Sequence, residues 1–184
     1  MKKELHILLL SAGLFMLAGG LFGPIYAVFV EDIGGDLLTA GMAYGAFAIA
    51  AGVLILFISK WEDRVKHKEK LLVLGYGMSC VGFLGYLFID KPWHLFLVQI
   101  VFGIGEAVSA PAFDALYSKN VQKGKVASQW GAWEGMDYMI GGVSAVIGGG
   151  FASLYGFKSL FGIMFILSLA GLLVSFFLVR GREK

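Results

Sequence analysis

The sequence predicts an all-α membrane protein, and three observations support this prediction. Hydrophobic residues make up 58% of the chain and charged residues 15%, whereas soluble domains average about 45–50% and about 25%. Six apolar stretches are each long enough to cross a bilayer as a helix, which takes about 17–25 residues. The connectors between them are short and carry most of the charge. We therefore expect residues 1–184 to form one transmembrane domain, without a soluble domain.

The six expected helices follow the apolar stretches in chain order, and the first needs separate justification. The chain opens with Met1, Lys2 and Lys3 before an apolar run, as a signal peptide does, but the run continues to residue 30 without an Ala-x-Ala-type cleavage site. We therefore interpret it as the first transmembrane helix. The six helices are expected at residues 5–30, 37–58, 71–89, 93–117, 126–155 and 159–179.

The second and fifth helices carry small residues four positions apart, while the third and sixth contain no charged residue. Small residues at this spacing let helix backbones approach closely in lipid. We expect these ridges to hold the bundle together, and the uncharged third and sixth helices to face lipid. The ridges consist of Gly41, Gly45, Ala48 and Gly52 in the second helix and of Gly141, Ala145 and Gly149 in the fifth.

Carboxylates lie inside the fourth and fifth helices, at Glu106 and Asp114 in one and at Glu134 and Asp137 in the other. An ionisable group at membrane depth is costly, and it usually serves a pathway, a partner or a water-filled cavity. Helical spacing places Glu106 on one face with Gln99, and counting residues from the cytoplasmic ends puts Glu106 and Asp137 near the bilayer midplane. These positions indicate transport.

The distribution of lysine and arginine predicts a single orientation in the membrane. Of the 15 basic residues, only Lys91 and Lys158 fall outside the two chain ends and the second and fourth connectors. Because basic residues are enriched in cytoplasmic loops, we expect both termini in the cytoplasm of a multi-pass cell-membrane protein. These basic segments match anionic lipid headgroups, so no nucleic-acid partner is expected.

A faint internal repeat relates the two halves of the sequence. Residues 23–29 near the end of the first helix resemble residues 110–116 near the end of the fourth, each with a proline followed two positions later by an aromatic ring. Two three-helix repeats in one chain would be inverted relative to each other in the membrane, a known transporter construction.

Three segments resemble motifs of the major facilitator superfamily. Residues 59–68 read Ser-Lys-Trp-Glu-Asp-Arg-Val-Lys-His-Lys and residues 99–107 read Gln-Ile-Val-Phe-Gly-Ile-Gly-Glu-Ala. The family patterns that they resemble are Gly-x-Leu-(Ala/Ser)-Asp-(Arg/Lys)-x-Gly-Arg-(Arg/Lys) and Arg-x-x-Gln-Gly-x-Gly-x-Ala. The fifth helix is similar to the antiporter motif through its small residues Ala132, Gly141, Ala145, Gly149 and Gly150.

The chain also departs from these patterns at defined positions. Asp63, Arg64 and Lys68 match the connector motif, but both of its glycines are replaced. Gln99 stands where the fourth-helix motif has arginine, and Val146 stands where the antiporter motif has proline.

The resemblance covers nearly the whole chain and implies one six-helix half of the major facilitator fold. Full-length members have twelve helices in two halves of the same orientation. A single half can therefore complete a central cavity by forming a parallel homodimer. The resemblance also suggests a conformation-sensitive cytoplasmic ion-pair cluster of Asp63, Arg64 and Asp114, because Asp114 at the negative end of its helix needs a cation.

The expected function is that of a secondary-transporter-like protein with alternating access to a polar cavity. The solute is expected to be a small organic or cationic molecule, with proton coupling as a further candidate. The substrate and proton-pathway candidates are Glu106, Glu134, Asp137, Gln99, Tyr26 and Trp133. As an alternative, the acids only lock the fourth and fifth helices together through hydrogen bonds.

Other classes of protein are weighed by the motifs they require. An enzyme is not expected, because Gly-x-Ser-x-Gly, His-Glu-x-x-His and paired-aspartate protease motifs are missing. No cofactor or metal site is expected either, and the single Cys80 fits a packing role. A non-transporting accessory or remnant subunit, a channel and a scramblase remain alternatives.

Overall fold

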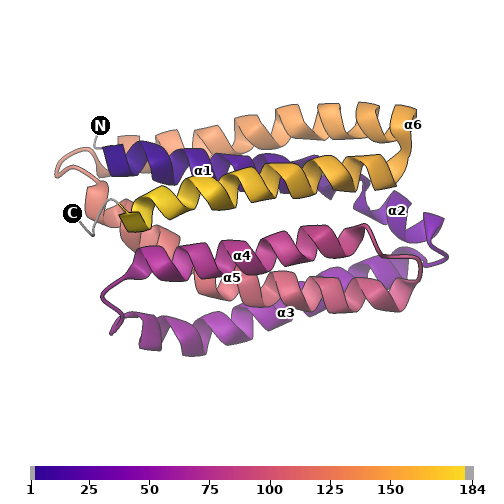
Figure 1. Ribbon diagram of the computed structural model, residues 1–184, viewed down its shortest axis with the longest axis horizontal. Coiled ribbons are helices and arrows are strands. Elements are labelled where there is room, and N and C mark those ends of the chain that lie inside the picture. Colours follow the sequence, from indigo (N-terminus) through magenta and orange to yellow (C-terminus); the bar gives the residue numbers. More distant parts are fainter. Residues whose placement is uncertain (1–2, 181–184) are drawn as a thin grey trace.

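The computed structural model describes residues 3–180, and all its regular structure is helical (Figure 1). Lys2, Arg182 and Lys184, part of the charge pattern above, lie outside the described residues. The elements are α1 (Lys3–Gly20), η1 (Gly23–Ile25), α2 (Tyr26–Asp32), α3 (Leu37–Glu62), α4 (Lys68–Tyr86), α5 (Pro92–Asn120) and α6 (Val126–Arg180). The predicted all-α class is confirmed.

The first expected helix is interrupted near its end. Pro24 stands at the start of the short η1, where its missing N–H and fixed φ suit a first helical turn but not a helix interior. The chain then continues as α2, so α1, η1 and α2 follow one apolar path from Glu4 to Asp32.

The fifth and sixth expected helices form α6, which folds back on itself at Gly156 (Figure 1). Gly156 has φ 78° and ψ 167°, a backbone conformation that glycine adopts without the steric penalty of a side chain. A straight 55-residue helix would be about 80 Å long, far more than the roughly 30 Å hydrocarbon core of a bilayer. The turn therefore divides α6 into two arms, residues 126–155 and 157–180.

Four described helical stretches meet the length and hydropathy expected of a membrane span: Glu4–Asp32, Leu37–Glu62, Pro92–Asn120 and Val126–Arg180. α4 begins with the charged run Lys68, Glu69 and Lys70 and has 19 residues. The chain is thus a multi-pass membrane protein whose apolar helices contact lipid. The count of six crossings requires α4 and both arms of α6, and it stays a prediction.

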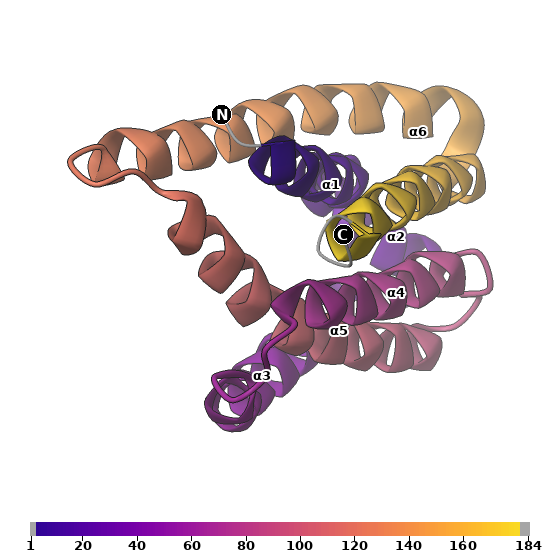
Figure 2. The ribbon, with the colours of Figure 1, turned by 60° about the vertical axis from the view of Figure 1, so that its left-hand side comes forward.

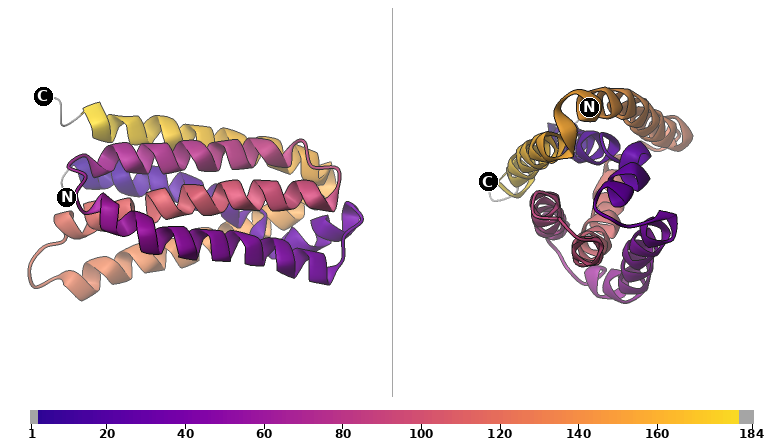
Figure 3. Two further views of the ribbon diagram at one scale, coloured as in Figure 1. Left: turned by 90° about the horizontal axis from the view of Figure 1, so that it is seen from below. Right: turned by 90° about the vertical axis from the view of Figure 1, so that its right-hand side faces the viewer.

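The helices form two groups that meet along α4 (Figures 2 and 3). α1 packs against α6, while α5 packs against both α3 and α4, and α4 also contacts α6. One buried cluster lies near α2 and is rich in aromatic rings, with Phe161 centred 5.1 Å from Phe22 and 4.9 Å from Phe29. The other lies toward the ends of the chain and includes Leu8 and Leu72.

Glycines on α5 set the distances to its two neighbours. A Cβ at Gly103 would lie 2.9 Å from the carbonyl oxygen of Phe47 in α3, and a Cβ at Gly105 would lie 3.0 Å from that of Gly75 in α4. Real Cβ contacts are longer, so only glycine lets α5 approach both helices this closely. With Gly103 and Gly105 facing neighbouring helices, Glu106 turns toward a third direction.

The predicted small-residue ridges make few close contacts within the chain, although the Cα of Gly141 lies 3.6 Å from the Cβ position of Gly20 in α1. A Cβ at Gly41, Gly45, Gly52, Gly141 or Gly149 would meet nothing within 4 Å. A much closer contact falls one position from Gly149, at Gly148, where a Cβ would collide with the carbonyl oxygen of Leu21, the residue that follows α1. Spacing alone identified a small-residue face but not which face meets a neighbouring helix.

The exposure of the helix faces also differs from the prediction that uncharged helices face lipid. α3 buries only Ala40, Ala43, Ala51 and Glu62, although its sequence suggested a packed helix. α4 lacks charge between Leu71 and Ile89 but buries one whole side, from Glu69 to Tyr86. The most open faces of the single chain are therefore those of α3 and of the first arm of α6.

Candidate functional site

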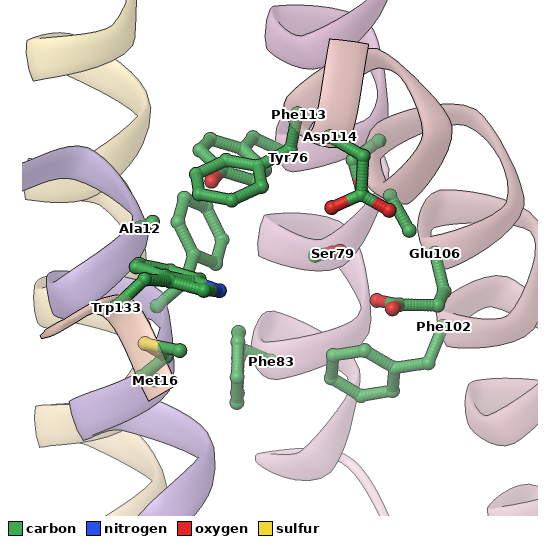
Figure 4. Close-up of a pocket in the computed structure, with 13 residues that line it drawn as sticks. Ala12, Met16, Tyr76, Ser79, Phe83, Phe102, Glu106, Phe113, Asp114 and Trp133 are labelled. Carbon is green, nitrogen blue, oxygen red and sulfur yellow. The ribbon is translucent and has the colours of Figure 1, made fainter. Parts of the chain in front are cut away.

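A cavity of about 470 Å³ opens between α1, α4, α5 and the first arm of α6 (Figure 4). We call it the acidic cavity, because Glu106 and Asp114 line it and no lysine, arginine or histidine does so within the described part of the chain. Its lining residues are Ala12, Phe15, Met16, Tyr76, Ser79, Phe83, Phe102, Glu106, Ser109, Ala110, Phe113, Asp114 and Trp133.

A second cavity of about 330 Å³ lies beside the first. We call it the aromatic cavity, because seven of its thirteen lining residues carry aromatic rings. Its lining residues are Gly19, Phe22, Gly23, Tyr26, Tyr44, Phe47, Ser79, Phe83, Tyr86, Gln99, Phe102, Glu106 and Met164.

Ser79, Phe83, Phe102 and Glu106 line both cavities. The rings of Phe83 and Phe102 are 4.9 Å apart at 79°, an edge-to-face contact between α4 and α5. Glu106 follows Phe102 by one helical turn and is the only charged residue that the two cavities have in common. The two aromatic rings and this carboxylate therefore form the boundary between the cavities.

One face of α5 supplies the acids of the site. Phe102, Glu106, Ala110, Phe113 and Asp114 recur at spacings of three and four, so they project from the same side of the helix. Both carboxylates point into the acidic cavity in Figure 4. Neither has a cation within 4.0 Å among the described residues, whose ion pairs involve two histidines instead. The acids are thus available to a cationic solute or to protons.

Two further candidates, Gln99 and Tyr26, meet in the aromatic cavity. The side-chain amide of Gln99 donates a hydrogen bond to the Tyr26 hydroxyl at 3.0 Å, which ties α5 to the start of α2. Gln99 is 6% exposed. A buried amide without a partner would be costly, so this bond stabilises the polar end of an otherwise aromatic wall.

Trp133 reaches the acidic cavity from the first arm of α6. Its ring is centred 4.5 Å from that of Phe113 and 6.0 Å from that of Tyr117. Aromatic contacts therefore connect α5 and α6 beside the acidic cavity.

Glu134 and Asp137 lie apart from this site. Both are exposed on the first arm of α6 and line neither cavity. The structure of the single chain thus separates them from Glu106, and their part in a substrate or proton pathway stays a prediction.

Asp63 and Arg64 are exposed in the connector between α3 and α4. Among the described residues, no ion pair within 4.0 Å joins them to Asp114, which faces the acidic cavity. The cytoplasmic ion-pair cluster of these three residues therefore stays a prediction too.

Sequence reasoning missed several residues of the site. Tyr76, Ser79 and Phe83 come from α4, which carries no charge that would have drawn attention to it. Outside both cavities, it also missed the burial of Glu62, which is 2% exposed and whose two carboxyl oxygens lack a hydrogen-bond partner among the described residues. No cluster of three or more metal-ligating residues occurs in residues 3–180.

The long apolar helices and the cavity lined by carboxylates of α5 are those of a multi-pass membrane protein. A family model of the Major Facilitator Superfamily matches residues 8–184, and the chain belongs to this superfamily. It is a family of transporters, so the chain is not classed as an enzyme.

Curated relatives with transporter names are similar along most of the chain. An uncharacterised MFS-type transporter of Methanocaldococcus jannaschii is 24% identical over 96% of this chain and 45% of its own length. Multidrug resistance protein MdtG of Serratia proteamaculans is 26% identical over 86% of the chain and 39% of its own length. MdtG of Salmonella typhimurium is 25% identical over 80% and 37%. The chain spans less than half the length of these relatives.

Proposed function

We propose that this chain is a six-crossing secondary-transporter unit of the cell membrane that moves a small organic cation by alternating access. The observation that carries the proposal is the acidic cavity, in which two carboxylates face an opening between apolar helices and have no cation within 4.0 Å among residues 3–180. The cost of placing such acids at membrane depth is offset when a cationic solute or protons occupy the cavity.

The proposed fold is two inverted three-helix repeats, α1 to α4 and α5 to α6. It is supported by the similarity between residues 23–29 and 110–116, and by the turn at Gly156, which gives the second repeat its third helix. An even number of crossings also agrees with the start of α1 and the end of α6 lying at the same end of the bundle (Figure 1).

The proposed orientation has both termini in the cytoplasm. The basic connectors that contain Arg64, Lys66, Lys123 and Lys125 lie at the same end of the bundle as the start of α1 and the end of α6 (Figure 1). Enrichment of basic residues at one end is the signal that places it on the cytoplasmic side.

We further propose that two copies in parallel orientation enclose the central cavity. The open faces of α3 and of the first arm of α6 support this, because they expose large apolar residues such as Ile49 at 69% and Val146 at 77%. These faces also carry the small residues that permit close helix approach and the exposed acids Glu134 and Asp137. A second copy would bring these acids toward the cavity.

Coupling and gating complete the proposal. Glu106 and Asp114 are the proposed proton or cation carriers, since no basic side chain lines their cavity. In a conformation closed to the cytoplasm, Arg64 would pair with Asp114 and Asp63, and opening to the cytoplasm would separate Arg64 from Asp114.

Uptake into proteoliposomes tests the transport proposal. Vesicles with the purified chain should take up quaternary ammonium ions, beginning with tetramethylammonium, in a saturable manner that an imposed pH gradient changes. Glu106→Gln should abolish the uptake, whereas Glu31→Gln, at an exposed α2 position outside both cavities, should preserve it.

Three outcomes would overturn this proposal. Uptake equal to empty vesicles would favour an accessory subunit, and non-saturable conductance or lipid scrambling would favour a channel or scramblase. Full uptake by Glu106→Gln with lowered thermal stability would show that the acids only hold helices together.

Cross-linking in native membranes tests the homodimer. In a Cys80→Ala background, the double variant Ile49→Cys/Val146→Cys should give a dimer with a bismaleimide reagent. Ile166→Cys, which is 65% exposed on the second arm of α6, serves as the matched control and should give little. A double variant that remains monomeric would contradict the proposed interface.

A further inference from the structure

We propose that the acidic and aromatic cavities are two compartments of one site for an aromatic amine, with the ammonium group at Glu106 and the ring in the aromatic cavity. The inference rests on the proposed function and names its substrate class. It concerns a single solute that occupies both compartments at once.

The shared boundary is the first argument. Glu106 borders both cavities, so a cation held there can have substituents in either direction. Phe83 and Phe102 stand beside it with their rings edge to face. An ammonium group at Glu106 would lie next to these rings, where cation–π attraction adds to the charge pairing.

The composition of the aromatic cavity is the second argument. Seven rings line it, and Glu106 is the only charged residue of its lining. Such a lining favours an aromatic ring, which gains both from burial and from edge-to-face or offset contacts. Its polar groups include Gln99 and Tyr26, whose side chains are hydrogen-bonded to each other, so the solute does not have to supply a hydrogen-bonding group for them.

The volumes are the third argument. An apolar cavity of about 150 Å³ is enough to hold benzene, so the aromatic cavity of about 330 Å³ has room for a substituted ring. The acidic cavity, at about 470 Å³, has room for the alkyl groups of the ammonium and places a second carboxylate, Asp114, on the same side of α5. A solute with one ammonium group and one aromatic ring therefore fits the pair of cavities better than a small inorganic cation does.

Glycine offers a way to fill the ring compartment without disturbing the helices. Gly19 lines the aromatic cavity, and a Cβ there would meet nothing within 4 Å. Gly19→Leu should therefore occupy space intended for the ring. Gly162 has equally open surroundings but lines neither cavity, so Gly162→Leu is the matched control.

Equilibrium binding to the purified full-length chain in detergent tests the proposal with three probes. Benzyltrimethylammonium has charge and ring, tetramethylammonium has the charge alone and benzyl alcohol has the ring alone. We expect benzyltrimethylammonium to bind about tenfold or more tightly than either fragment, since both compartments contribute.

The variants then separate the two compartments. Gly19→Leu should reduce benzyltrimethylammonium binding to the level of tetramethylammonium and leave tetramethylammonium unchanged, whereas Glu106→Gln should remove the preference for benzyltrimethylammonium over benzyl alcohol. Gly162→Leu should bind as the unmodified chain does, and circular dichroism should show that all variants fold.

Three results would overturn the divided site. The unmodified chain could bind benzyltrimethylammonium and tetramethylammonium with equal affinity, or it could fail to bind benzyltrimethylammonium. In Gly19→Leu, the affinities for both ammonium probes could fall by the same factor. Saturable uptake of tetramethylammonium that depends on Glu106 would still support transport in each case. Failure of this inference is thereby distinguished from failure of the proposed function.

Discussion

Gly148 offers the sharpest test of how α1 and α6 pack. A Cβ at this position would collide with the carbonyl oxygen of Leu21 and lie 2.5 Å from its carbonyl carbon and 2.7 Å from its Cα. All three are backbone atoms, which no side-chain rotation can move away. Gly148→Ala must therefore push the two helices apart.

The magnitude follows from two opposing effects. Overpacking of a well-packed contact costs about 1–3 kcal/mol, and the higher helix propensity of alanine returns at most about 1 kcal/mol. Because the clashing atoms are all backbone, the cost lies at the upper end of that range, and Gly148→Ala should lower the free energy of unfolding by about 2 kcal/mol. Gly149→Ala meets nothing within 4 Å, so only the propensity gain remains and the variant should be as stable as the unmodified chain or more so.

Unfolding followed by far-ultraviolet circular dichroism in dilute detergent compares the two neighbours under identical conditions. The sequence ridge predicts the larger loss at Gly149, while the structure predicts it at Gly148. Equal stability of the two variants, or a greater loss for Gly149→Ala, would refute the placement of α1 on α6.

Three further predictions concern single side chains. Glu62→Met should raise the free energy of unfolding by about 1–3 kcal/mol, because it replaces a buried carboxyl without partners by an apolar side chain of similar length; lower stability in a denaturation series would contradict this. Tyr26→Phe should lower it by about 1–3 kcal/mol, because the buried Gln99 amide loses its acceptor, and unchanged stability would show that the bond is dispensable. Hydrogen bonds from Thr39 hold the pKa of Asp36, the N-cap of α3, below its usual value. The stability that these bonds contribute is therefore present above the pKa of Asp36 in the unfolded chain and is lost as the pH falls through its lower pKa in the folded chain. Asp36→Ala should lower the melting temperature most at neutral pH and progressively less on acidification. A lowering of the melting temperature that does not depend on pH would exclude this role.

The features that could be predicted from the sequence are those set by length and composition. The apolar stretches predicted the helices, because a segment that lies in lipid must satisfy its backbone hydrogen bonds internally and therefore becomes helical. Glu106 was identified because an acid at membrane depth is rare, and the structure places it at the boundary of both cavities.

The features that could not be predicted depend on how helices rotate about their axes. Glu134 and Asp137 share a helix with Trp133, yet only Trp133 reaches the acidic cavity of the single chain. Gly148, and not the predicted Gly149, meets Leu21 at the end of α1, because a rotation of one residue, about 100° in a helix, changes the neighbour. Ring-lined walls from α4 escaped notice because aromatic residues in an apolar helix carry no distinguishing pattern.

The central claim is that a six-helix unit with an acidic cavity needs a second copy to move a solute across the membrane. The most direct test measures the initial rate of tetramethylammonium uptake while the number of chains per vesicle is lowered to one and below. The account predicts a rate that rises with the square of protein density at low density, with no uptake in vesicles that hold a single chain. A rate strictly proportional to density, with uptake by single chains, would contradict it.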